Sequence, residues 1–253
     1  MKILVPTLSR AGKVRIFRDL PNATLLVDYS QAADYRAAYP DADLHVLPEG
    51  VCGIAGVREY CVRDVGGKIL MLDDDLWFYT RREDDEGKLV NASERDMVNL
   101  LEAVEDALDD YAHVGIAARE GFNRFKGLGD ILENQRYIRA LGINADMVPA
   151  DVDFTRVQVM EDFDVALQLL ERGLPSGILT RWAQGQVQTQ MAGGCSDYRT
   201  HENHERAAKK LHELHPEFVR LRQKENKSGG EFGTRTEVTI YWKKAFASSQ
   251  VKS

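Results

Sequence analysis

The stretch that decides the fold is Lys68-Ile69-Leu70-Met71-Leu72-Asp73-Asp74-Asp75, in which an apolar run passes directly into three acidic residues. Gly66 and Gly67 precede the run and end the helical pattern before it. A continuous apolar run of this length is typical of a strand buried on both faces of a parallel sheet. Ligands of such sheets bind at the carboxyl ends of the strands, which is where the acidic triplet (Asp73, Asp74 and Asp75) falls.

Short apolar runs and helical patterns alternate on both sides of this strand. Apolar runs bounded by Pro, Asn, Asp or Gly predict buried strands, at residues 3–5, 24–28, 44–47 and 113–117. Amphipathic spacing predicts helices, at residues 30–38, 54–65, 94–111, 160–172 and 200–215. Repeated strand–helix–strand units imply an α/β fold with a Rossmann-like, mixed and mostly parallel sheet that carries helices on both faces.

The chain is expected to form one such domain over residues 1–222, followed by a C-terminal part over residues 223–253. Within that part, residues 223–235 are polar and rich in glycine, which predicts a flexible loop, and residues 237–242 predict a closing strand. Residues 81–91 and 119–130 predict exposed loops, because the first is highly charged and the second is basic and rich in glycine.

Composition bounds the class of protein. The 253 residues can bury one substantial core, with 43% hydrophobic and 29% charged residues as in an ordinary globular protein. No apolar run approaches the ~18 residues of a membrane span, so no membrane association is expected. The three cysteines are odd in number and share no metal-ligand spacing. A reduced, cytoplasmic chain is therefore expected, in the host cytoplasm if a phage encodes it.

The net charge of −7 argues against a protein whose whole surface binds nucleic acid, but the charge is unevenly spread. Residues 201–253 hold 11 Lys and Arg against 7 Asp and Glu, a net charge of +4, which leaves −11 for the first 200 residues. A basic C-terminal segment could contact a polyanion on one face, although a solvated helix and tail explain the count equally well.

The acidic triplet carries the strongest chemical signal. Three adjacent carboxylates repel one another, and burying them without a cation would cost several kcal/mol. A hard divalent ion resolves the conflict, and Mn²⁺ or Mg²⁺ would also hold a substrate diphosphate. Alternation along an extended chain would place Asp73 and Asp75 on one side and Asp74 on the other. The structural alternative is an exposed acidic turn that caps the next element.

Glu161 and Asp162 form a second acidic pair, at the start of the helix expected over residues 160–172. One of these carboxylates is a candidate general base that accepts the proton of an acceptor hydroxyl. The helix dipole would help to keep it ionised. The same dipole also favours acidic residues in any first helical turn, so a structural preference competes with this interpretation.

Three loops add candidate ligands for a nucleotide. Pro6, Thr7 and Arg10 follow the first strand, and their hydroxyl and guanidinium groups suit a base and a phosphate. Residues 53–58 open a helix whose free N–H groups, with Arg58, suit a diphosphate. Residues 193–201 form a glycine-led loop in which Arg199 could neutralise a phosphate, and His201 or His204 could complete a metal shell. A turn or a surface side chain explains each one alone.

In this order, the motifs resemble those of GT-A glycosyltransferases over roughly residues 1–200. The chain resembles more closely the TET-associated and base-J-type glucosyltransferases, phage and kinetoplastid enzymes that add sugar to hydroxymethylated pyrimidines in DNA. The stretches behind the closer resemblance are residues 69–77, residues 193–200 and Arg235-Thr236-Glu237-Val238-Thr239-Ile240-Tyr241-Trp242-Lys243-Lys244.

The resemblance implies a metal-dependent transfer of a sugar, expected to be glucose, from a UDP-sugar to 5-hydroxymethylcytosine or a similar base in DNA, with inversion. It places Asp73 and Asp75 at a Mn²⁺ or Mg²⁺ ion and Asp74 near the donor sugar or ribose. Thr7, Arg10 and Asp28 would contact the uridine, Arg58 the diphosphate, and Asp162 would be the base. DNA binding would depend on residues 119–126 and on the basic C-terminal segment.

Three other functions remain open at this point. The net acidity favours a GT-A enzyme that acts on a glycan, a lipid or a small molecule. A metal-dependent nucleotidyltransferase or phosphohydrolase could use the same acidic strand end, but no strand is followed by a P-loop Lys-Ser/Thr pattern. A binding module without activity would leave the triplet without a role. The oligomeric state, the sugar and the anomer do not follow from the sequence.

Overall fold

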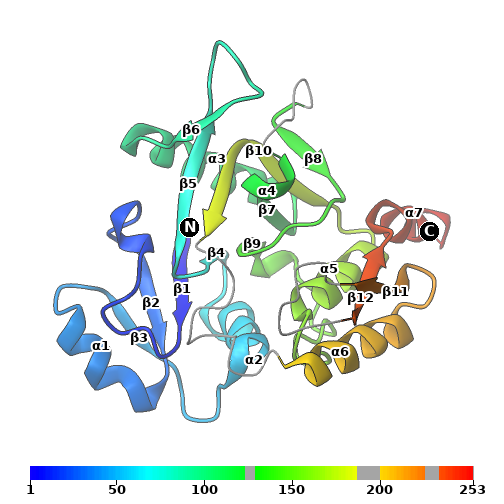
Figure 1. Ribbon diagram of the computed structural model, residues 1–253, viewed down its shortest axis with the longest axis horizontal. Coiled ribbons are helices and arrows are strands. Elements are labelled where there is room, and N and C mark those ends of the chain that lie inside the picture. The colour runs from blue at the N-terminus through cyan, green and yellow to red at the C-terminus, as the bar shows by residue number, and fades with distance from the viewer. Residues whose placement is uncertain (123–128, 187–199, 226–233, 253) are drawn as a thin grey trace.

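The computed structural model describes residues 1–122, 129–186, 200–225 and 234–252. Within these residues one sheet has the strand order β3-β2-β1-β4-β9-β7-β10-β5-β6, and β8 pairs with β10 (Figure 1). The strands of this sheet are β1 (Lys2–Thr7), β2 (Thr24–Val27), β3 (Leu44–Val46), β4 (Lys68–Leu72), β5 (Leu76–Arg81), β6 (Leu89–Asn91), β7 (His113–Ala118), β8 (Ile131–Glu133), β9 (Ala140–Asn144) and β10 (Ser176–Gln186).

The strand directions confirm a mixed, mostly parallel sheet. The ladders β1–β2, β2–β3, β1–β4 and β7–β10 are parallel. β9 runs antiparallel to both β4 and β7, while β5 and β8 run antiparallel to β10, and β6 runs antiparallel to β5. β1 to β4, β6, β7 and β10 therefore share one direction, and their carboxyl ends lie at one edge of the sheet.

Alternation along β4 shows why both faces of the sheet are covered. Leu70 and Leu72 pack into one apolar cluster, which includes side chains of α1 and α3. Ile69 and Met71 point to the other face and pack into a second cluster, with side chains of α2 and α5. Successive strand residues face opposite sides, so the predicted continuous apolar run corresponds to a strand with helices on both faces.

The predicted helices are all confirmed, with small differences at their ends. They are α1 (Ala32–Ala38), α2 (Gly53–Tyr60) with a following π-helical turn (Cys61–Val65), α3 (Glu94–Asp110), α5 (Glu161–Glu171) and α6 (His201–Leu214). Among the described residues two further α-helices were not predicted, α4 (Arg119–Phe122) and α7 (Trp242–Lys252). The prediction of a loop over residues 119–130 is wrong at its start, because α4 occupies it. None of the helices among the described residues is long and apolar enough to cross a membrane.

The prediction of an exposed loop over residues 81–91 is confirmed for residues 82–88 and wrong at both ends, because Arg81 belongs to β5 and residues 89–91 form β6, which pairs with β5 in a hairpin. Arg81 is buried, and its guanidinium donates hydrogen bonds to the carbonyl oxygens of Thr180 (2.6 Å) and Glu86 (2.7 Å). Charge alone suggested a solvated loop. The backbone carbonyls that satisfy Arg81 come from a distant strand and from the turn, and the local sequence pattern does not show them.

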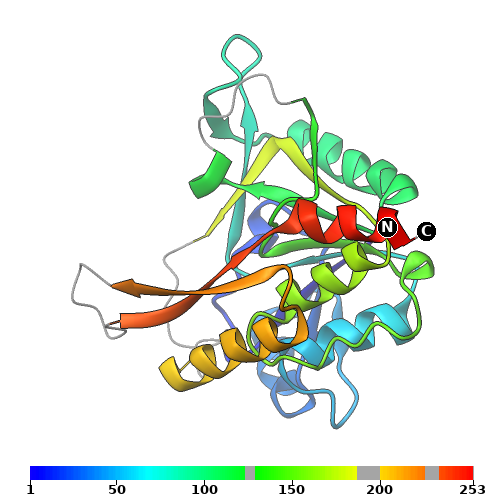
Figure 2. The same ribbon diagram turned by 90° about the vertical axis from the view of Figure 1, so that its right-hand side faces the viewer.

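The C-terminal part forms a separate two-stranded hairpin, β11 (Val219–Glu225) and β12 (Thr234–Ile240), between α6 and α7. The predicted boundary after residue 222 falls inside β11, and the closing strand ends at Ile240 because Trp242 begins α7. A third apolar cluster joins this part to α5 and contains Leu167, Leu170, Leu211, Val219 and Ala245. Figure 2 shows the hairpin projecting well beyond the helices that flank it.

A buried ionic network reinforces the same junction. Asp164 on α5 accepts hydrogen bonds from Arg156 (2.6 and 3.0 Å) and from Nε2 of His215 (2.8 Å). The other ring nitrogen of His215 contacts Glu171. Burial alone lowers the pKa of His215, but the hydrogen bonds to Asp164 and Glu171 outweigh burial and raise it above its ordinary value. For Asp164, burial raises the pKa, yet the bonds from His215 and Arg156 leave it below its ordinary value.

The network predicts a defined pH window of stability. The His215 contribution is fully present below the unfolded pKa of about 6.5 and is lost as pH rises through the raised folded value. The Asp164 contribution is present above about pH 4 and is lost as pH falls through its lowered folded value. We expect urea unfolding to give a lower free energy at pH 8.5 than at pH 5.5. In His215→Gln this difference should shrink markedly; an unchanged difference would contradict the assignment.

Candidate active site

The predicted site residues of the first strands meet at one edge of the sheet. β1, β2 and β4 are parallel and adjacent, so Thr7, Asp28 and the acidic triplet all follow strand ends at this edge (Figure 1). The triplet lies in the turn between β4 and β5, not in an extended segment. The turn nevertheless buries Asp74 and leaves Asp73 and Asp75 partly exposed, which is the division that alternation predicts.

Asp74 holds the loop that follows β1. One carboxylate oxygen accepts a hydrogen bond from the hydroxyl of Thr7 (2.6 Å), and the other accepts one from the guanidinium of Arg10 (2.5 Å). The Tyr35 hydroxyl on α1 bonds to the Thr7 hydroxyl (2.9 Å) and accepts the backbone N–H of Arg10 (2.9 Å). In addition, the Asp74 carbonyl accepts the N–H of Arg15 (2.8 Å), so this residue fixes two points of the loop.

The electrostatics of Asp74 reflect this position. Burial raises the pKa of its carboxyl above the ordinary value, while the hydrogen bond from Thr7 and the charge of Arg10 act in the opposite direction. Burial likewise raises the pKa of the Tyr35 phenol. Asp74 therefore sets the positions of Thr7 and Arg10.

Asp73 and Asp75 present the carboxylates that could hold a metal ion. Arg10 also contacts Asp75 (3.3 Å), and the backbone N–H of Asp73 donates to the carbonyl oxygen of Arg139 (3.0 Å). The described residues contain no group of three His, Cys, Asp or Glu side chains arranged around one point. Two carboxylates still fit Mg²⁺ or Mn²⁺, because such ions commonly take one or two carboxylates and complete their shell with substrate phosphates and water.

Backbone strain concentrates around the same edge. Among the described residues, four that are not glycine have a positive φ, and three of them adjoin predicted site residues. Ser9 (φ 57°) precedes Arg10, Arg139 (φ 66°) holds Asp73, and Met160 (φ 69°) precedes Glu161 and Asp162. A left-handed conformation is unfavourable for such residues and is often found where a site must be held in a fixed shape.

The second acidic pair divides into a buried and an exposed carboxylate. Glu161 is 3% exposed and accepts a hydrogen bond from Arg58 of α2 (2.6 Å), which is itself buried. Asp162 is partly exposed. The predicted diphosphate ligand Arg58 and the predicted catalytic Glu161 thus contact each other, and of the two carboxylates Asp162 is the more exposed.

Residues 137–139 connect Asp162 with the acidic triplet. Burial raises the pKa of Tyr137, the nearby charge of Asp162 adds to that rise, and Arg58 opposes it, so all three groups are close together. Two residues later the Arg139 carbonyl accepts the N–H of Asp73. Two extended residues span about 7 Å at most, so this segment brings α5 close to the turn after β4.

A Cβ at Gly115 would lie 2.2 Å from that of Tyr137, so β7 needs glycine here.

A pocket of about 320 Å³ opens beside the Thr7–Arg10 loop. Its lining residues are Ser9, Ala11, Lys13, Gln31, Asp34 and Tyr35. Gln31 is tied to Ser9 by two hydrogen bonds, of 2.8 Å from the Ser9 N–H and 3.0 Å to its hydroxyl. Asp28 caps the short helix Tyr29–Gln31 by accepting hydrogen bonds from Ser30, and these bonds lower the pKa of its carboxyl. The pocket is large enough for a small ligand.

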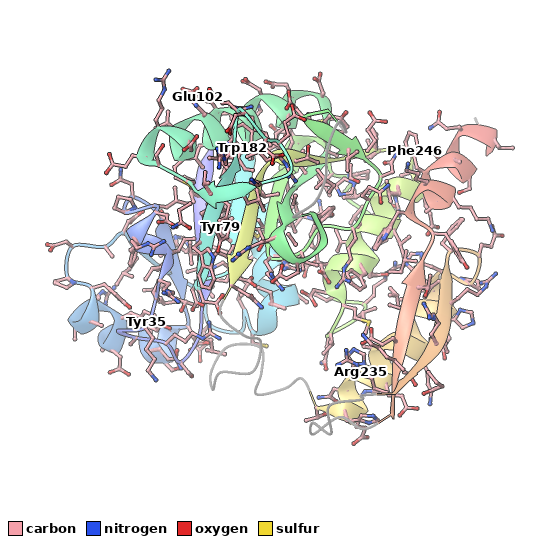
Figure 3. The ribbon with its side chains drawn as sticks, turned by 45° about the horizontal axis from the view of Figure 1, so that its top comes forward. Tyr35, Tyr79, Glu102, Trp182, Arg235 and Phe246 are labelled. Atoms are coloured by element: carbon pink, nitrogen blue, oxygen red, sulfur yellow. The ribbon has the colours of Figure 1, made fainter. Side chains whose placement is uncertain are left out.

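Aromatic and guanidinium groups continue from the triplet along β5. Arg15 lies over the ring of Trp77 (5.0 Å), and Trp77 donates to the hydroxyl of Tyr79. Arg119 lies over the Tyr79 ring (4.5 Å) and donates to its hydroxyl (2.7 Å). On β10, a Cβ at Gly185 would lie 3.0 Å from the Trp77 ring, so glycine lets the aromatic rings lie close to the strand. Figure 3 shows Tyr79, a residue of β5, apart from Tyr35 in this view.

The remaining predicted residues lie outside the described residues or on α6. Arg199, together with the glycine-led loop before it, and Lys126 lie outside the described residues. His201 and His204 occupy the first turn of α6. Sequence reasoning missed Tyr35, Arg139 and the Trp77–Tyr79 pair, whose roles come from contacts with distant segments; the aromatic character of residues 77–79 was the only local signal.

Comparisons with known proteins agree with this geometry. A model of the TET-associated glycosyltransferases matches residues 1–194. A beta-glucosyl-HMC-alpha-glucosyl-transferase of Enterobacteria phage T6 is 26% identical over 233 residues, covering 87% of this chain and 83% of that protein. The enzyme of the same description from Enterobacteria phage T2 is 25% identical over the same shares.

Two solved structures that match this chain are distant from it in sequence. A mannose-1-phosphate geranyltransferase from Thermus thermophilus matches with a TM-score of 0.42 and 11% identity, over 73% of this chain and 75% of that one. A197 from STIV matches with a TM-score of 0.38 and 12% identity, over 74% and 86% of the two chains.

Proposed function

Because the chain belongs to the TET-associated glycosyltransferase family, we propose that it moves glucose from UDP-glucose to a hydroxymethylated pyrimidine of DNA, with the help of Mn²⁺ or Mg²⁺. That it is a glycosyltransferase follows from the family and from its phage relatives. The observation that carries the finer proposal is the sheet edge at which Asp73 and Asp75 face outward beside the Thr7–Arg10 loop.

The donor half of the proposal uses the pocket beside that loop. Gln31, Ser9 and Lys13 offer hydrogen-bond donors and acceptors to a uracil base and its ribose, as Asp28 does at the neighbouring strand end. Arg10 lies between this pocket and the triplet, so its guanidinium can contact both the nucleotide and the diphosphate. The side chain is already held by Asp74, which lowers the entropic cost of binding.

Asp73 and Asp75 would hold the metal ion, with the donor diphosphate supplying further oxygen ligands. When bound, the ion offsets the negative charge that develops on the diphosphate as the sugar–phosphate bond breaks. Arg10, which contacts Asp74 and Asp75, would stabilise the same charge. Asp74 stays with Thr7 and Arg10 and keeps the loop in place during the reaction.

Asp162 is the proposed base. The acceptor oxygen attacks the anomeric carbon, the bond to the diphosphate breaks with its electron pair leaving on UDP, and Asp162 takes the hydroxyl proton. The buried Arg58–Glu161 pair fixes the start of α5 and so the position of Asp162. Attack from the face opposite the leaving group inverts the anomeric centre, which is the course we propose.

The names of the phage relatives suggest a second acceptor and a way to check the proposed inversion. They describe beta-glucosyl-HMC as acceptor and an alpha-glucosyl transfer. A base that already carries glucose presents sugar hydroxyls, so this chain is proposed to accept such a base as an alternative. From an α-linked donor, an α-linked product would mean retention and would contradict a single displacement with Asp162 as base.

The donor assignment has a direct test. Purified protein with Mn²⁺ should bind UDP and should release it from UDP-glucose, whereas GDP and GDP-mannose should give at most one tenth of the signal, as followed by calorimetry and coupled release assays. Proton NMR of the transferred glucose then gives the anomer. Equal use of both donors would contradict a uridine site in the pocket.

A glycan, a lipid or a small molecule is the alternative acceptor, which the net charge of −7 favours. If such an acceptor stimulates the release of UDP and DNA does not, this alternative is supported.

A further inference from the structure

The hairpin of β11 and β12 is amphipathic. On one face Val219 pairs with Ile240, and Leu221 pairs with Val238. Val219, Val238 and Ile240 belong to or pack against the third apolar cluster, which also contains side chains of α6. On the opposite face the alternating positions carry basic residues, Arg220, Arg222 and Lys224 from β11 and Arg235 from β12. The hairpin thus has one face committed to the fold and one that faces solvent.

Charge on the solvent face is strongly one-sided. Its four cations are offset by Glu237, which pairs with Arg235 (2.5 Å) and lies opposite Arg222 in the register. Lys224 lies directly opposite Arg235. Like charges in directly opposite positions destabilise an antiparallel pair, and a bound anion would relieve that repulsion. Four cations against one carboxylate leave an excess of three positive charges, and the length of seven residues, about 23 Å, suits contact with a polyanion.

The position of the hairpin also favours a polyanion as its partner. Figure 2 shows the hairpin projecting to the side of the molecule where β10 ends, and β10 ends at the active edge of the sheet. Figure 3 shows Arg235 near the free end of the hairpin. The family match ends at residue 194, so the hairpin lies beyond the part that the family model describes. The rest of the chain is acidic, which leaves this face as a distinct basic surface.

We propose that the basic face of the hairpin (Arg220, Arg222, Lys224 and Arg235) binds the sugar-phosphate backbone of duplex DNA beside the target base. This inference rests on the proposed function and specifies the form of its acceptor. A hydroxymethyl group inside a duplex must be turned out of the stack to reach an active site, and the enzyme must hold the flanking duplex while that happens. A duplex offers one phosphate per ~1.7 Å, so several fall within the length of the hairpin.

The test is the triple variant Arg222→Gln, Lys224→Gln and Arg235→Gln, compared with Arg36→Gln, Lys88→Gln and Arg95→Gln, three exposed cations elsewhere. Anisotropy of a labelled duplex across a salt series gives affinity. The hairpin variant should bind at least tenfold more weakly, and its slope of log K against log salt should be smaller by about 2.7, that is about 0.9 per cation. The control should change both values far less. Release of UDP without DNA should be unchanged in both.

The outcomes separate the two proposals. Equal transfer to duplex by the wild type and the hairpin variant, with equal salt slopes, overturns the hairpin surface and leaves the glycosyl transfer intact. No transfer to any DNA by the wild type, with UDP still released, overturns the DNA acceptor itself. The single variant Lys224→Gln, at an exposed position, is the check if the triple variant folds poorly, and a slope reduced by about 0.9 supports the surface.

Discussion

Asp75→Ala is expected to lower the rate of UDP-glucose turnover by about 1,000-fold, equivalent to ~4 kcal/mol, while the protein stays folded. Asp75 is partly exposed, and its contact with Arg10 (3.3 Å) is longer than the contact of Arg10 with Asp74 (2.5 Å). Its removal therefore disturbs the loop little and removes one of two outward carboxylates. A coupled assay of UDP release, with thermal melts as the folding check, measures the effect.

Two further variants are compared with Asp75→Ala. Asp84→Ala removes an exposed carboxylate in the turn of the β5–β6 hairpin and should leave turnover unchanged. Asp74→Asn should instead weaken UDP binding, because the loop of Thr7 and Arg10 loses its anchor. If a well-folded Asp75→Ala protein keeps its turnover and its dependence on Mn²⁺, the metal assignment is wrong.

Asp162→Asn is expected to reduce transfer by 100- to 10,000-fold, on the order of what a general base contributes, with UDP affinity unchanged. The amide keeps the size of the side chain but accepts no proton. Titration of UDP by calorimetry and single-turnover transfer, measured on the same sample, separate binding from chemistry.

Glu161→Gln is the matched control, one residue earlier in α5. It removes the negative charge that pairs with the buried Arg58, so we expect the free energy of unfolding to fall by ~3 kcal/mol and transfer by the folded fraction to persist. A stable Glu161→Gln protein without transfer would move the base to Glu161. Loss of UDP affinity in Asp162→Asn would place Asp162 in the donor site.

Much of the fold could be predicted because the physical signals are local. The apolar run before the triplet alternates between two cores, and the helix over residues 94–110 begins with a Ser93–Asp96 capping box. β10 gave no such signal. Its buried Thr180 and Gln184 are satisfied by the carbonyl oxygens of Gly129 and Ile138, roughly fifty residues away in the chain, so polar residues that look exposed are interior.

In the candidate site, too, some features could be predicted from the sequence and others could not. The triplet and the loop after β1 follow strand ends, so their convergence follows from parallel pairing alone. The residues that hold the triplet and this loop in place cannot be predicted from strand pairing. Tyr35 looks like an ordinary buried helix residue, yet its hydroxyl holds Thr7 and Arg10. Arg58 and Glu161 are 103 residues apart, and only the three-dimensional packing shows that they neutralise each other.

The most direct test of the central claim is nucleoside mass spectrometry of duplex DNA after incubation with the protein, UDP-glucose and Mn²⁺. Three duplexes of one sequence carry cytosine, 5-hydroxymethylcytosine or its β-glucosyl derivative at a single position, and Asp162→Asn is the control enzyme. The account predicts one added hexose on a modified base, none on cytosine, and none with the variant. Release of UDP without hexose on any of the three duplexes would contradict it.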